Sequence, residues 1–548
     1  MKKFKLLLLL IGLIYLGCTK EEITSIGQEG TYAANFDFPT GTLGAPAKVV
    51  LTNRSKNADR FEWEFTGGKT LNKSGVSNAT TSNKMVPDTI LYELPGEYTV
   101  KLTTWQGDKK EEISKKITLI KMQPRIIAPA NIAVFEDVQF DSKAFNYPGQ
   151  GLTYSWNFGA AGTSTLKNPV IKFTTEGEHT ITLTVNDGQE ILTTEIKILV
   201  KGELARTIYF TDVVTKKIYS YKLTVLSQSV PVALPGVTTG PTPLGLSISG
   251  TKLYLSDAGL GLSFTGATNV ARFGDGYLKA FNLDGSGERL ITKNVAVTDG
   301  AYNLDPWLHT VDKDGNIWWG TRNDGVYTAN ASATEIPYPT FKFRGVPTVT
   351  SFSSSSHFYS GIREVNDQIW VSFTGNGGKG LHKFKKNGEF VEEIALLKEF
   401  GIRQFVVDSK NSKIYLAVNR GPSGYEPGIY RCDLNGANII PIYNSTADMG
   451  FAGTVGFSNQ GYLSANNFPT GETTFVTGME LDQDDTGNGY LYFGYRHRSD
   501  SNGAGAPQTV GTGANSGIKR YKLDGTAPVD FLLKGYAPYG IAIDQVKR

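Results

Sequence analysis

The stretch Ile414-Tyr415-Leu416-Ala417, followed after a loop by Ile429-Tyr430-Arg431-Cys432-Asp433-Leu434-Asn435-Gly436, decides the fold of most of this chain. Both runs are rich in aromatic and β-branched residues, and the second ends in an Asn-Gly turn, which is typical of paired strands. Similar units recur at intervals of about 40 to 60 residues. They begin at Ile208, Leu253, Ile317, Ile369, Ile414 and Leu491. The pattern predicts an array of short strands without a substantial helix.

Four-stranded units at this period resemble the blades of a β-propeller of the YWTD or NHL type, which would occupy residues 205–548. Six blades are the favoured number, and the strand-like runs between Phe451 and Asn467 leave seven as the alternative. The segment Gly540–Asp544 looks like an inner strand, whereas the first unit begins without one. We therefore expect the C-terminal strand to complete the first blade and close the ring.

Two segments before the repeats, residues 31–122 and 123–201, echo each other. Each contains an aromatic-x-Trp-x-Phe run, Phe61–Phe65 and Tyr154–Phe158, followed by a strand that begins with Gly-Glu. These runs resemble the PKD domain, an immunoglobulin-like β-sandwich, although the usual Asp-Phe-Gly-Asp is absent from both. Trp63 and Trp156 are expected to be core anchors. The predicted fold class is all-β, with two immunoglobulin-like sandwiches followed by a β-propeller.

The N-terminus carries the features of a secreted lipoprotein. Residues 1–17 combine a basic start with a short apolar run, which is typical of a signal peptide. Gly17-Cys18 resembles the bacterial lipobox, which implies lipidation of Cys18, with residues 18–30 as a lipidated leader. Lys20-Glu21-Glu22 resembles the surface-export signal of Bacteroidota lipoproteins. The prediction is a protein anchored by lipid in the outer membrane and facing the cell exterior.

Charge and cysteine content limit the partners and the chemistry. Lysine and arginine total 55 against 52 acidic residues, so the near-neutral balance argues against nucleic acid as a partner. Once Cys18 is lipidated, Cys432 is the one cysteine left. The protein therefore has no intramolecular disulfide, and its cores must stabilise it alone.

The loops of the predicted propeller differ between its two faces. Turns between the first and second, and between the third and fourth, strands of each unit are short, whereas the remaining connections are long. Long loops on one face are typical of a scaffold that presents a binding surface. Aromatic rings suit the apolar faces of sugars, and guanidinium groups suit hydroxyls or carboxylates. The candidate ligand-binding residues on or beside this face are Trp307, Tyr359, Arg363, Arg420, Tyr425, Tyr495, Arg496 and Arg498. Of these, Tyr425, Tyr495, Arg496 and Arg498 are expected to occupy the two longest late loops.

Aromatic residues also pack propeller blades together. For Trp318, Trp319 and Trp370 we favour this core role over ligand binding. The run Asp482–Gly489 is rich in oxygen ligands but lacks the terminal glutamate of a calcium loop. We therefore predict no metal site and no cofactor. No catalytic residue is assigned, because no zinc spacing, nucleophile elbow or phosphate loop occurs. An enzyme would need acids and histidines around the axis, for which the candidates are Asp305, His309, Glu364, Asp408 and Glu480.

These features favour a surface lipoprotein that binds or recruits a nutrient polymer, either a glycan or a peptide. Surface lipoproteins of this kind accompany outer-membrane importers of the SusC/SusD type, so transporter subunits are a second class of expected partner. Two alternatives stay open. The propeller could be a lyase or hydrolase, or the protein could be an adhesin that binds a host or matrix protein.

Overall fold

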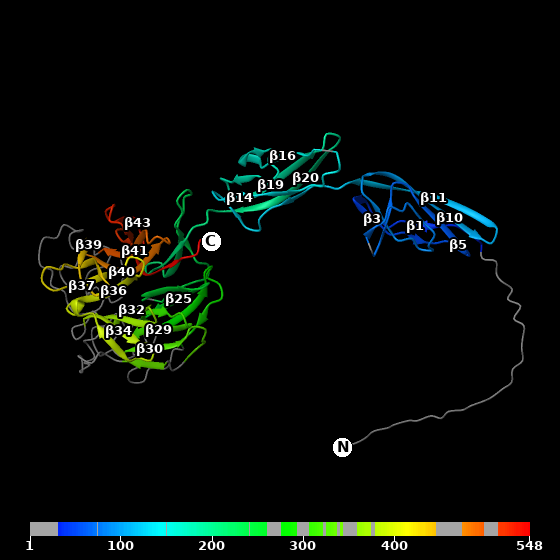
Figure 1. Ribbon diagram of the computed structural model, residues 1–548. Helices are drawn as coiled ribbons and strands as arrows, with labels where there is room; N and C mark the ends of the chain where they lie inside the picture. The colour runs from blue at the N-terminus through cyan, green and yellow to red at the C-terminus, as the bar shows by residue number, and fades with distance from the viewer. Residues whose placement is uncertain are drawn as a thin grey trace, which may run out of the picture. The chain divides into compact units, whose positions relative to one another are not determined.

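A computed structural model describes residues 31–548 with internal gaps. The gaps are residues 74, 150, 241, 260–275, 293–305, 322–324, 337–339, 344–358, 374–378, 445–473 and 498–512. The described residues form two compact units that divide between Gly202 and Glu203 (Figure 1). Apart from short 3-10 turns, every regular element described is a β-strand, which confirms the all-β class. No helix in the described ranges is long and apolar enough to cross a membrane.

The first β-sandwich lies in the N-terminal half of the first unit. Its larger sheet contains, in spatial order, β2 (Leu43–Ala45), β11 (Lys109–Lys121), β10 (Gly96–Gln106), β5 (Arg60–Phe65) and β8 (Thr81–Ser82). The facing strands are β3 (Ala47–Val49), β9 (Thr89–Tyr92), β6 (Lys69–Asn72) and β7 (Gly75–Val76), and β1 (Phe36–Asp37) pairs with β4 (Thr52–Asn53). In β5, Trp63 and Phe65 are buried while Glu62 and Glu64 face solvent. This alternation confirms Trp63 as a core anchor.

The second β-sandwich has a related arrangement. Its main sheet contains β13 (Ile132–Ala133), β20 (Ile191–Lys201), β19 (Gly177–Asn186), β16 (Thr153–Asn157) and β17 (Thr163–Ser164). The remaining pairs are β14 (Asp137–Gln139) with β18 (Val170–Lys172), and β12 (Arg125–Ile127) with β15 (Asp141–Lys143). Trp156 is buried, stacks on Phe158 at 5.5 Å between ring centroids, and donates a hydrogen bond to the carbonyl of Leu166. Trp156 is therefore the second core anchor, as predicted.

The second unit contains six described four-stranded sheets, which we call blades one to six. Blades one to three are β44 (Pro538–Asp544), β21 (Thr207–Asp212), β22 (Lys217–Lys222), β23 (Val232–Ala233); β24 (Gly245–Ser249), β25 (Lys252–Asp257), β26 (Tyr277–Asn282), β27 (Arg289–Leu290); and β28 (Pro306–Val311), β29 (Asn316–Thr321), β30 (Val326–Asn330), β31 (Thr340–Phe343). Blades four to six are β32 (Tyr359–Val365), β33 (Gln368–Phe373), β34 (Gly380–Lys385), β35 (Phe390–Glu393); β36 (Gly401–Asp408), β37 (Lys413–Arg420), β38 (Gly428–Asp433), β39 (Ile440–Asn444); and β40 (Thr474–Gln483), β41 (Gly489–His497), β42 (Gly517–Lys522), β43 (Asp530–Lys534). Trp318, Trp319 and Trp370 are buried between these sheets, as expected.

The ring closes through the C-terminal strand. β44 pairs antiparallel with β21, so the last strand of the chain is the inner strand of blade one, and this prediction is confirmed. The inner strands β44, β24, β28, β32, β36 and β40 contact one another in that order, and β40 contacts β44 again. Closure places the unpaired edges of the inner strands around the axis, where neighbouring blades protect them. The seven-blade alternative depends on residues 451–467, which lie outside the described residues, so the blade number stays a prediction.

Hydroxyl side chains near the ends of second strands link neighbouring blades. Thr211 in blade one donates to the carbonyl of Pro243 at 3.0 Å, and Ser256 in blade two donates to the carbonyl of Trp307 at 2.7 Å. In each case the acceptor belongs to the segment that begins the inner strand of the next blade. These two hydroxyls therefore help to fix where the inner strands of blades two and three start.

The two faces of the propeller differ, as the sequence predicts. The hairpin at Asn366 and Asp367 has φ values of 48° and 65°, as in a type I′ turn. The connections on the opposite face include residues 258–276, 421–427 and 498–516. In blades one and three, however, the connection between second and third strands is short, spanning 213–216 and 322–325. The length asymmetry is therefore confined to part of the ring.

Candidate functional site

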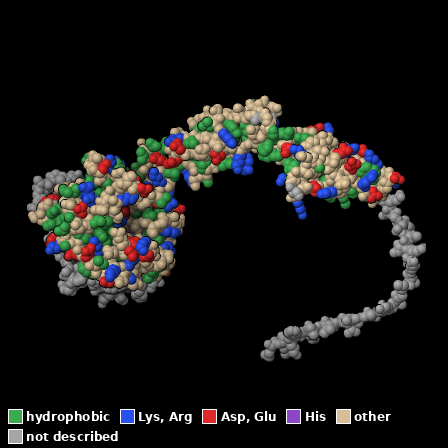
Figure 2. Space-filling model, in the orientation of Figure 1, with side chains coloured by type: hydrophobic (Ala, Val, Ile, Leu, Met, Phe, Trp, Pro, Cys, Tyr) green, Lys and Arg blue, Asp and Glu red, His purple; other side chains and the backbone are tan. Residues whose placement is uncertain are grey.

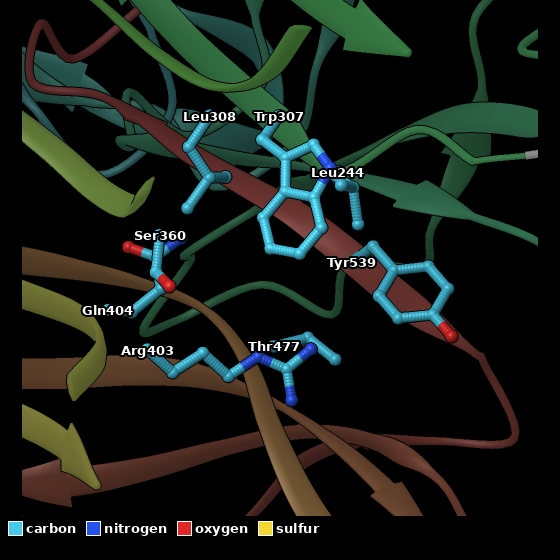
Figure 3. A pocket seen from close by; sticks show the side chains of 8 residues that line it. All are labelled: Leu244, Trp307, Leu308, Ser360, Arg403, Gln404, Thr477 and Tyr539. Carbon is cyan, nitrogen blue, oxygen red and sulfur yellow. The ribbon is translucent and has the colours of Figure 1, made fainter. Parts of the chain in front are cut away.

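A cavity lies on the propeller axis where the inner strands begin. Its volume is about 20 Å³, and together with the open solvent at its mouth the space is about 310 Å³. Its lining, drawn in Figure 3, comes from all six blades: Leu244, Trp307, Leu308, Ser360, Arg403, Gln404, Thr477 and Tyr539. Leu244 directly precedes an inner strand, and the other lining residues lie within the first four positions of one. The cavity, which we call the axial cavity, therefore opens toward the face of the long connections.

The lining combines aromatic and cationic groups. In Figure 3 the indole of Trp307 lies across the cavity from the guanidinium of Arg403, with Tyr539 to one side. A second guanidinium, that of Arg496 in β41, lies 5.8 Å from the ring centroid of Tyr539. Burial raises the pKa of Tyr539, and the charges of Arg496 and Arg403 oppose that shift. Two buried cations thus act on one wall of the cavity.

Two polar groups at this wall have no hydrogen-bond partner within the described part of the chain. They are Nε and Nη1 of Arg496 and the hydroxyl of Thr477. Both residues are more than nine-tenths buried, with exposures of 3% and 4%. Buried polar groups are satisfied in the great majority of cases, so these two are exceptions, although Arg496 is not part of the cavity lining.

A second cavity, of about 30 Å³, continues along the axis beneath the first. Arg363 in β32 forms an ion pair with Glu480 in β40 at 2.7 Å, and it donates to the carbonyls of Phe405 and Met479. Burial raises the pKa of Glu480, and the charge of Arg363 opposes the rise. These bonds give the guanidinium of Arg363 its hydrogen-bond partners and connect blades four, five and six. The pair of Arg363 and Glu480 therefore has a structural role in the channel.

His309 also faces the axis, and its bonds define its protonation. Ser256 gives its one hydroxyl hydrogen to the carbonyl of Trp307, so Nδ1 of His309 must donate to Ser256, at 3.0 Å. Nε2 then accepts from Ser247 at 2.8 Å. Burial, aided by the charge of Arg363, lowers the pKa of His309 to about 3. The neutral ring therefore supports the strand that carries Trp307.

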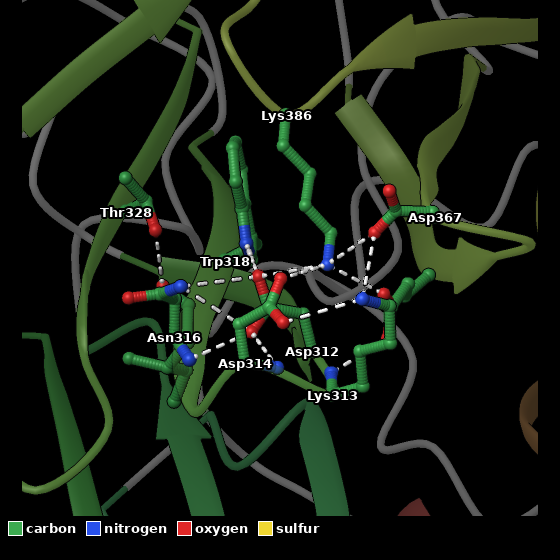
Figure 4. A network of polar contacts seen from close by, with 10 residues as sticks. Asp312, Lys313, Asp314, Asn316, Trp318, Thr328, Asp367 and Lys386 are labelled. Carbon is green, nitrogen blue, oxygen red and sulfur yellow. Dashed lines mark hydrogen bonds and ion pairs between the residues drawn. The ribbon is translucent and has the colours of Figure 1, made fainter.

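The other acids considered for catalysis do not converge with His309. Glu364 lies in a network at the short-turn face, where Lys386 forms ion pairs with Glu364 at 2.7 Å, Asp314 at 2.6 Å and Asp367 at 3.0 Å (Figure 4). Asp408 accepts hydrogen bonds from Asn411 and so shapes a turn. Asp305 lies outside the described residues.

The structure places the predicted binding residues unevenly. Trp307 lines the axial cavity, whereas Arg363 lies deeper in the channel. The expectation that Tyr495 and Arg496 occupy a loop is wrong, because pairing with β40 extends β41 through His497 and both side chains are buried. The ring of Tyr495 packs against Phe531 and Lys519. Packing within blade six therefore explains this aromatic residue.

Of the remaining predicted residues, one packs against a hydrophobic core and the others lie, in whole or in their side chains, outside the described part of the chain. Tyr425 is partly buried and packs against Phe400 at 4.9 Å between ring centroids, beside the core shared by blades four and five. The side chains of Tyr359 and Arg420 lie outside the described residues, although their backbones belong to β32 and β37. Cys18 and Arg498 also lie outside them.

Sequence reasoning missed seven of the eight lining residues, among them Arg403, Thr477 and Tyr539. One signal was available for Arg403, since the adjacent polar pair Arg403 and Gln404 within the otherwise apolar run Gly401–Val407 is unusual for a strand buried on both faces. The other two stand at positions where threonine and tyrosine are common in any strand. Their role depends on which strands meet at the axis.

The residues that the structure describes contain no group of three or more metal-binding side chains. In the acidic run after β40, Asp484 accepts hydrogen bonds from the backbone of Thr486 and Asn488, and Asp482 is paired with Arg206. These carboxylates have structural partners within the turn and beside it. Acidic and basic side chains are interspersed on the face shown in Figure 2, in line with the near-neutral net charge.

Comparison with known proteins identifies one family. Residues 122–200 match the model of the PKD domain, which corresponds to the second sandwich. The match does not extend to residues 31–121, so the kinship of the first sandwich to this family stays a prediction. No curated protein matches the chain.

Solved structures similar to the chain include several of low sequence identity. A nidogen–laminin complex is 11% identical with a TM-score of 0.36, covering 62% of this chain and 98% of that chain. A quinonprotein alcohol dehydrogenase-like protein from Bacteroides thetaiotaomicron is 13% identical with a TM-score of 0.33, covering 77% and 99%. The β-propeller domain of Cps50 (Swd1) from Myceliophteria thermophila is 10% identical with a TM-score of 0.33, covering 60% and 87%. The strand topology and the family match show an all-β chain in which a domain that matches the PKD model, at residues 122–200, precedes a β-propeller.

Proposed function

We propose that this protein is a surface lipoprotein whose propeller binds a nutrient polymer, with a glycan favoured over a peptide, and holds one unit of it at the mouth of the axial cavity. The observation that carries the proposal is the lining of that cavity by residues from all six blades. The cavity itself, about 20 Å³, has room for about one water molecule, so the ligand would lie mainly at its mouth. Aromatic and polar groups around one space suit a sugar, which presents an apolar face and a hydroxylated edge.

Binding without catalysis is favoured over the enzyme alternative. Glycoside hydrolysis requires two carboxyl groups about 5 to 10 Å apart around the scissile bond. The described lining of the axial cavity contains no carboxyl group. Glu480 lies in the deeper cavity and is neutralised by Arg363.

The binding test compares two isosteric substitutions. Thr477→Val removes a cavity hydroxyl that has no partner, so folding stability should be unchanged. Thr328→Val is the control, because its hydroxyl bonds the carbonyl of Ile317 in blade three, away from the axis. A panel of neutral and acidic oligosaccharides and of peptides is screened, and titration calorimetry on the hits follows. Loss of one hydrogen bond, worth about 1 kcal/mol, weakens affinity several-fold in Thr477→Val alone. Equal affinities in both variants would place the site elsewhere, and product formation would support an enzyme.

The anchor is tested separately. Cys18→Ala should leave the protein unlipidated and recoverable without detergent, since two or more acyl chains on one residue provide stable attachment to a membrane. Replacing Lys20, Glu21 and Glu22 by alanine should preserve lipidation but reduce cleavage of the protein by protease added to whole cells. Retention of Cys18→Ala in the membrane fraction at the normal level would contradict the anchor. A co-purification from cells tests the proposed transporter partner.

A further inference from the structure

The two sandwiches of the first unit are joined by a short stretch of chain. β11 ends at Lys121 in the first sandwich and β12 begins at Arg125 in the second, so residues 122–124 form the whole connection. Neighbouring domains move relative to each other by default unless they share a substantial interface. Whether this joint bends therefore depends on the contacts that cross it.

Tyr147 of the second sandwich is built into the core of the first. It lies in the connection between β15 and β16, yet its side chain packs in the hydrophobic cluster of the first sandwich and is 4% exposed. Its hydroxyl donates to the carbonyl of Ala45 at 2.6 Å and accepts from the backbone N–H of Met122 at 2.9 Å. Ala45 ends β2 and pairs with Lys121 at the end of β11. One side chain therefore bonds to the ends of two strands of the neighbouring sandwich.

A buried ion pair also crosses the joint. The ammonium of Lys121 donates to the carboxylate of Asp187, and the two side chains are 9% and 7% exposed. Asp187 lies in the turn between β19 and β20 of the second sandwich, where its carboxylate also accepts from the backbone N–H groups of Gln189 and Glu190. The carboxylate of Glu190 lies 3.5 Å from the same ammonium. Separating a buried pair leaves both charges uncompensated, so this contact opposes movement of the joint.

Ion pairs within one sandwich lack this burial. Lys116 pairs with Glu97 in the first sandwich, where the side chains are 67% and 56% exposed. Lys197 pairs with Glu178 in the second, where they are 66% and 62% exposed. Pairs in contact with water contribute little to stability. The pair at the joint therefore differs from them by being enclosed where the two sandwiches meet.

We infer that residues 31–202 form one rigid segment, locked at the joint by Tyr147 and by the pair of Lys121 and Asp187. The connection 122–124, the contact of Tyr147 and the ion pair attach the second sandwich to the first through three separate parts of its chain. Three attachments oppose both bending and rotation, whereas a single connection opposes neither. The chain that precedes the propeller is then a stiff spacer and not a flexible tether, whatever ligand the propeller binds.

The test measures the distance between spin labels on the two sandwiches of the full-length protein. The labels are attached to cysteines introduced at two exposed strand positions, by Glu62→Cys and Glu195→Cys. A Cys18→Ala background leaves only the buried thiol of Cys432 besides them. Pulsed electron paramagnetic resonance gives the distribution of distances. We expect one narrow distribution, which Tyr147→Phe combined with Asp187→Asn broadens at least about twofold, because domains without a firm interface move freely.

The matched control combines Tyr98→Phe with Glu178→Gln. These changes remove a hydroxyl that donates to Leu94 within the first sandwich and a carboxylate that pairs with Lys197 within the second. The control should keep the narrow distribution. A broad distribution in the background protein would overturn the rigid segment. A narrow distribution in the Tyr147 variant, or equal broadening in both double variants, would overturn the lock.

A melting measurement on the same samples separates a lock from a general loss of stability. Both double variants should keep the melting transitions of the background protein, because each sandwich retains its own apolar core. If the Tyr147 variant lacks one of these transitions, Tyr147 is needed to fold the first sandwich, and its role as a lock is overturned.

Discussion

The carboxylate of Asp212 accepts a hydrogen bond of 2.7 Å from the backbone N–H of Ala537, although 325 residues separate the two. The same carboxylate accepts from the backbone and hydroxyl of Thr215, at 3.1 and 2.6 Å. Ala537 directly precedes β44, so this buried carboxylate holds the closing strand at its starting point. One side chain in the first blade therefore secures the last strand of the chain.

Replacing Asp212 by alanine should reduce the unfolding free energy of the propeller by about 2 to 3 kcal/mol, because it leaves buried backbone donors without an acceptor. Urea unfolding followed by tryptophan fluorescence measures the change. Asp524→Ala is the matched control, since that carboxylate caps an exposed turn by accepting from Thr526. Equal effects of the two substitutions would show that the ring does not depend on this bond. Deletion of residues 540–548 should be more damaging still, because it removes most of β44.

Lys386→Met should lower the melting temperature at neutral pH by more than Lys385→Met. Lys386 joins carboxylates from two neighbouring blades, whereas Lys385 pairs with Glu389 alone. The hydrogen bonds of Lys386 lower the pKa of Asp314 and of Asp367. A lowered carboxyl pKa stabilises the fold above the unfolded-state pKa, near 4, and this stabilisation disappears as the pH falls through the folded value. The difference between the variants should therefore shrink below about pH 4, and a constant difference would contradict the ionic explanation.

His309 should make the propeller less stable in mild acid. Its pKa is about 3 in the folded protein, against about 6.5 when unfolded, so only the unfolded state gains a proton between these values. Folding stability then falls by up to about 1.4 kcal/mol for each pH unit below about 6. Relative to the wild type, His309→Gln should lose less stability between pH 7 and pH 5 in urea titrations. Parallel pH profiles would indicate that the ring is protonated in the folded state.

Cys432 should be unreactive in the native protein. Its side chain is buried in blade five, and burial raises the pKa of the thiol to about 12, so almost no thiolate exists at pH 8. In a Cys18→Ala background, iodoacetamide should label Cys432 only after denaturation, as read by intact mass. Rapid labelling of the folded protein would show that blade five opens readily.

The sequence by itself determined the elements and their order. Alternation of apolar and polar residues in Phe61–Phe65 and Ile181–Val185 predicts strands, because successive side chains of a strand point to opposite faces. The Asn-Gly and Asp-Gly turns fix the hairpins locally, and the spare inner strand at Gly540–Asp544 predicts ring closure. All of these signals extend over only a few residues. They were readable without knowledge of the rest of the fold.

Only the tertiary structure decided the site. The axial cavity collects residues from Leu244 to Tyr539, and no local pattern distinguishes Thr477 or Tyr539 from other strand residues. Arg496 was wrongly expected in a loop, because the extent of β41 depends on its pairing with β40. The missing partners of its guanidinium are equally invisible in the sequence, since partners are set by which blades meet. Strand periodicity is local, whereas the convergence of six inner strands on one axis is a property of the closed ring.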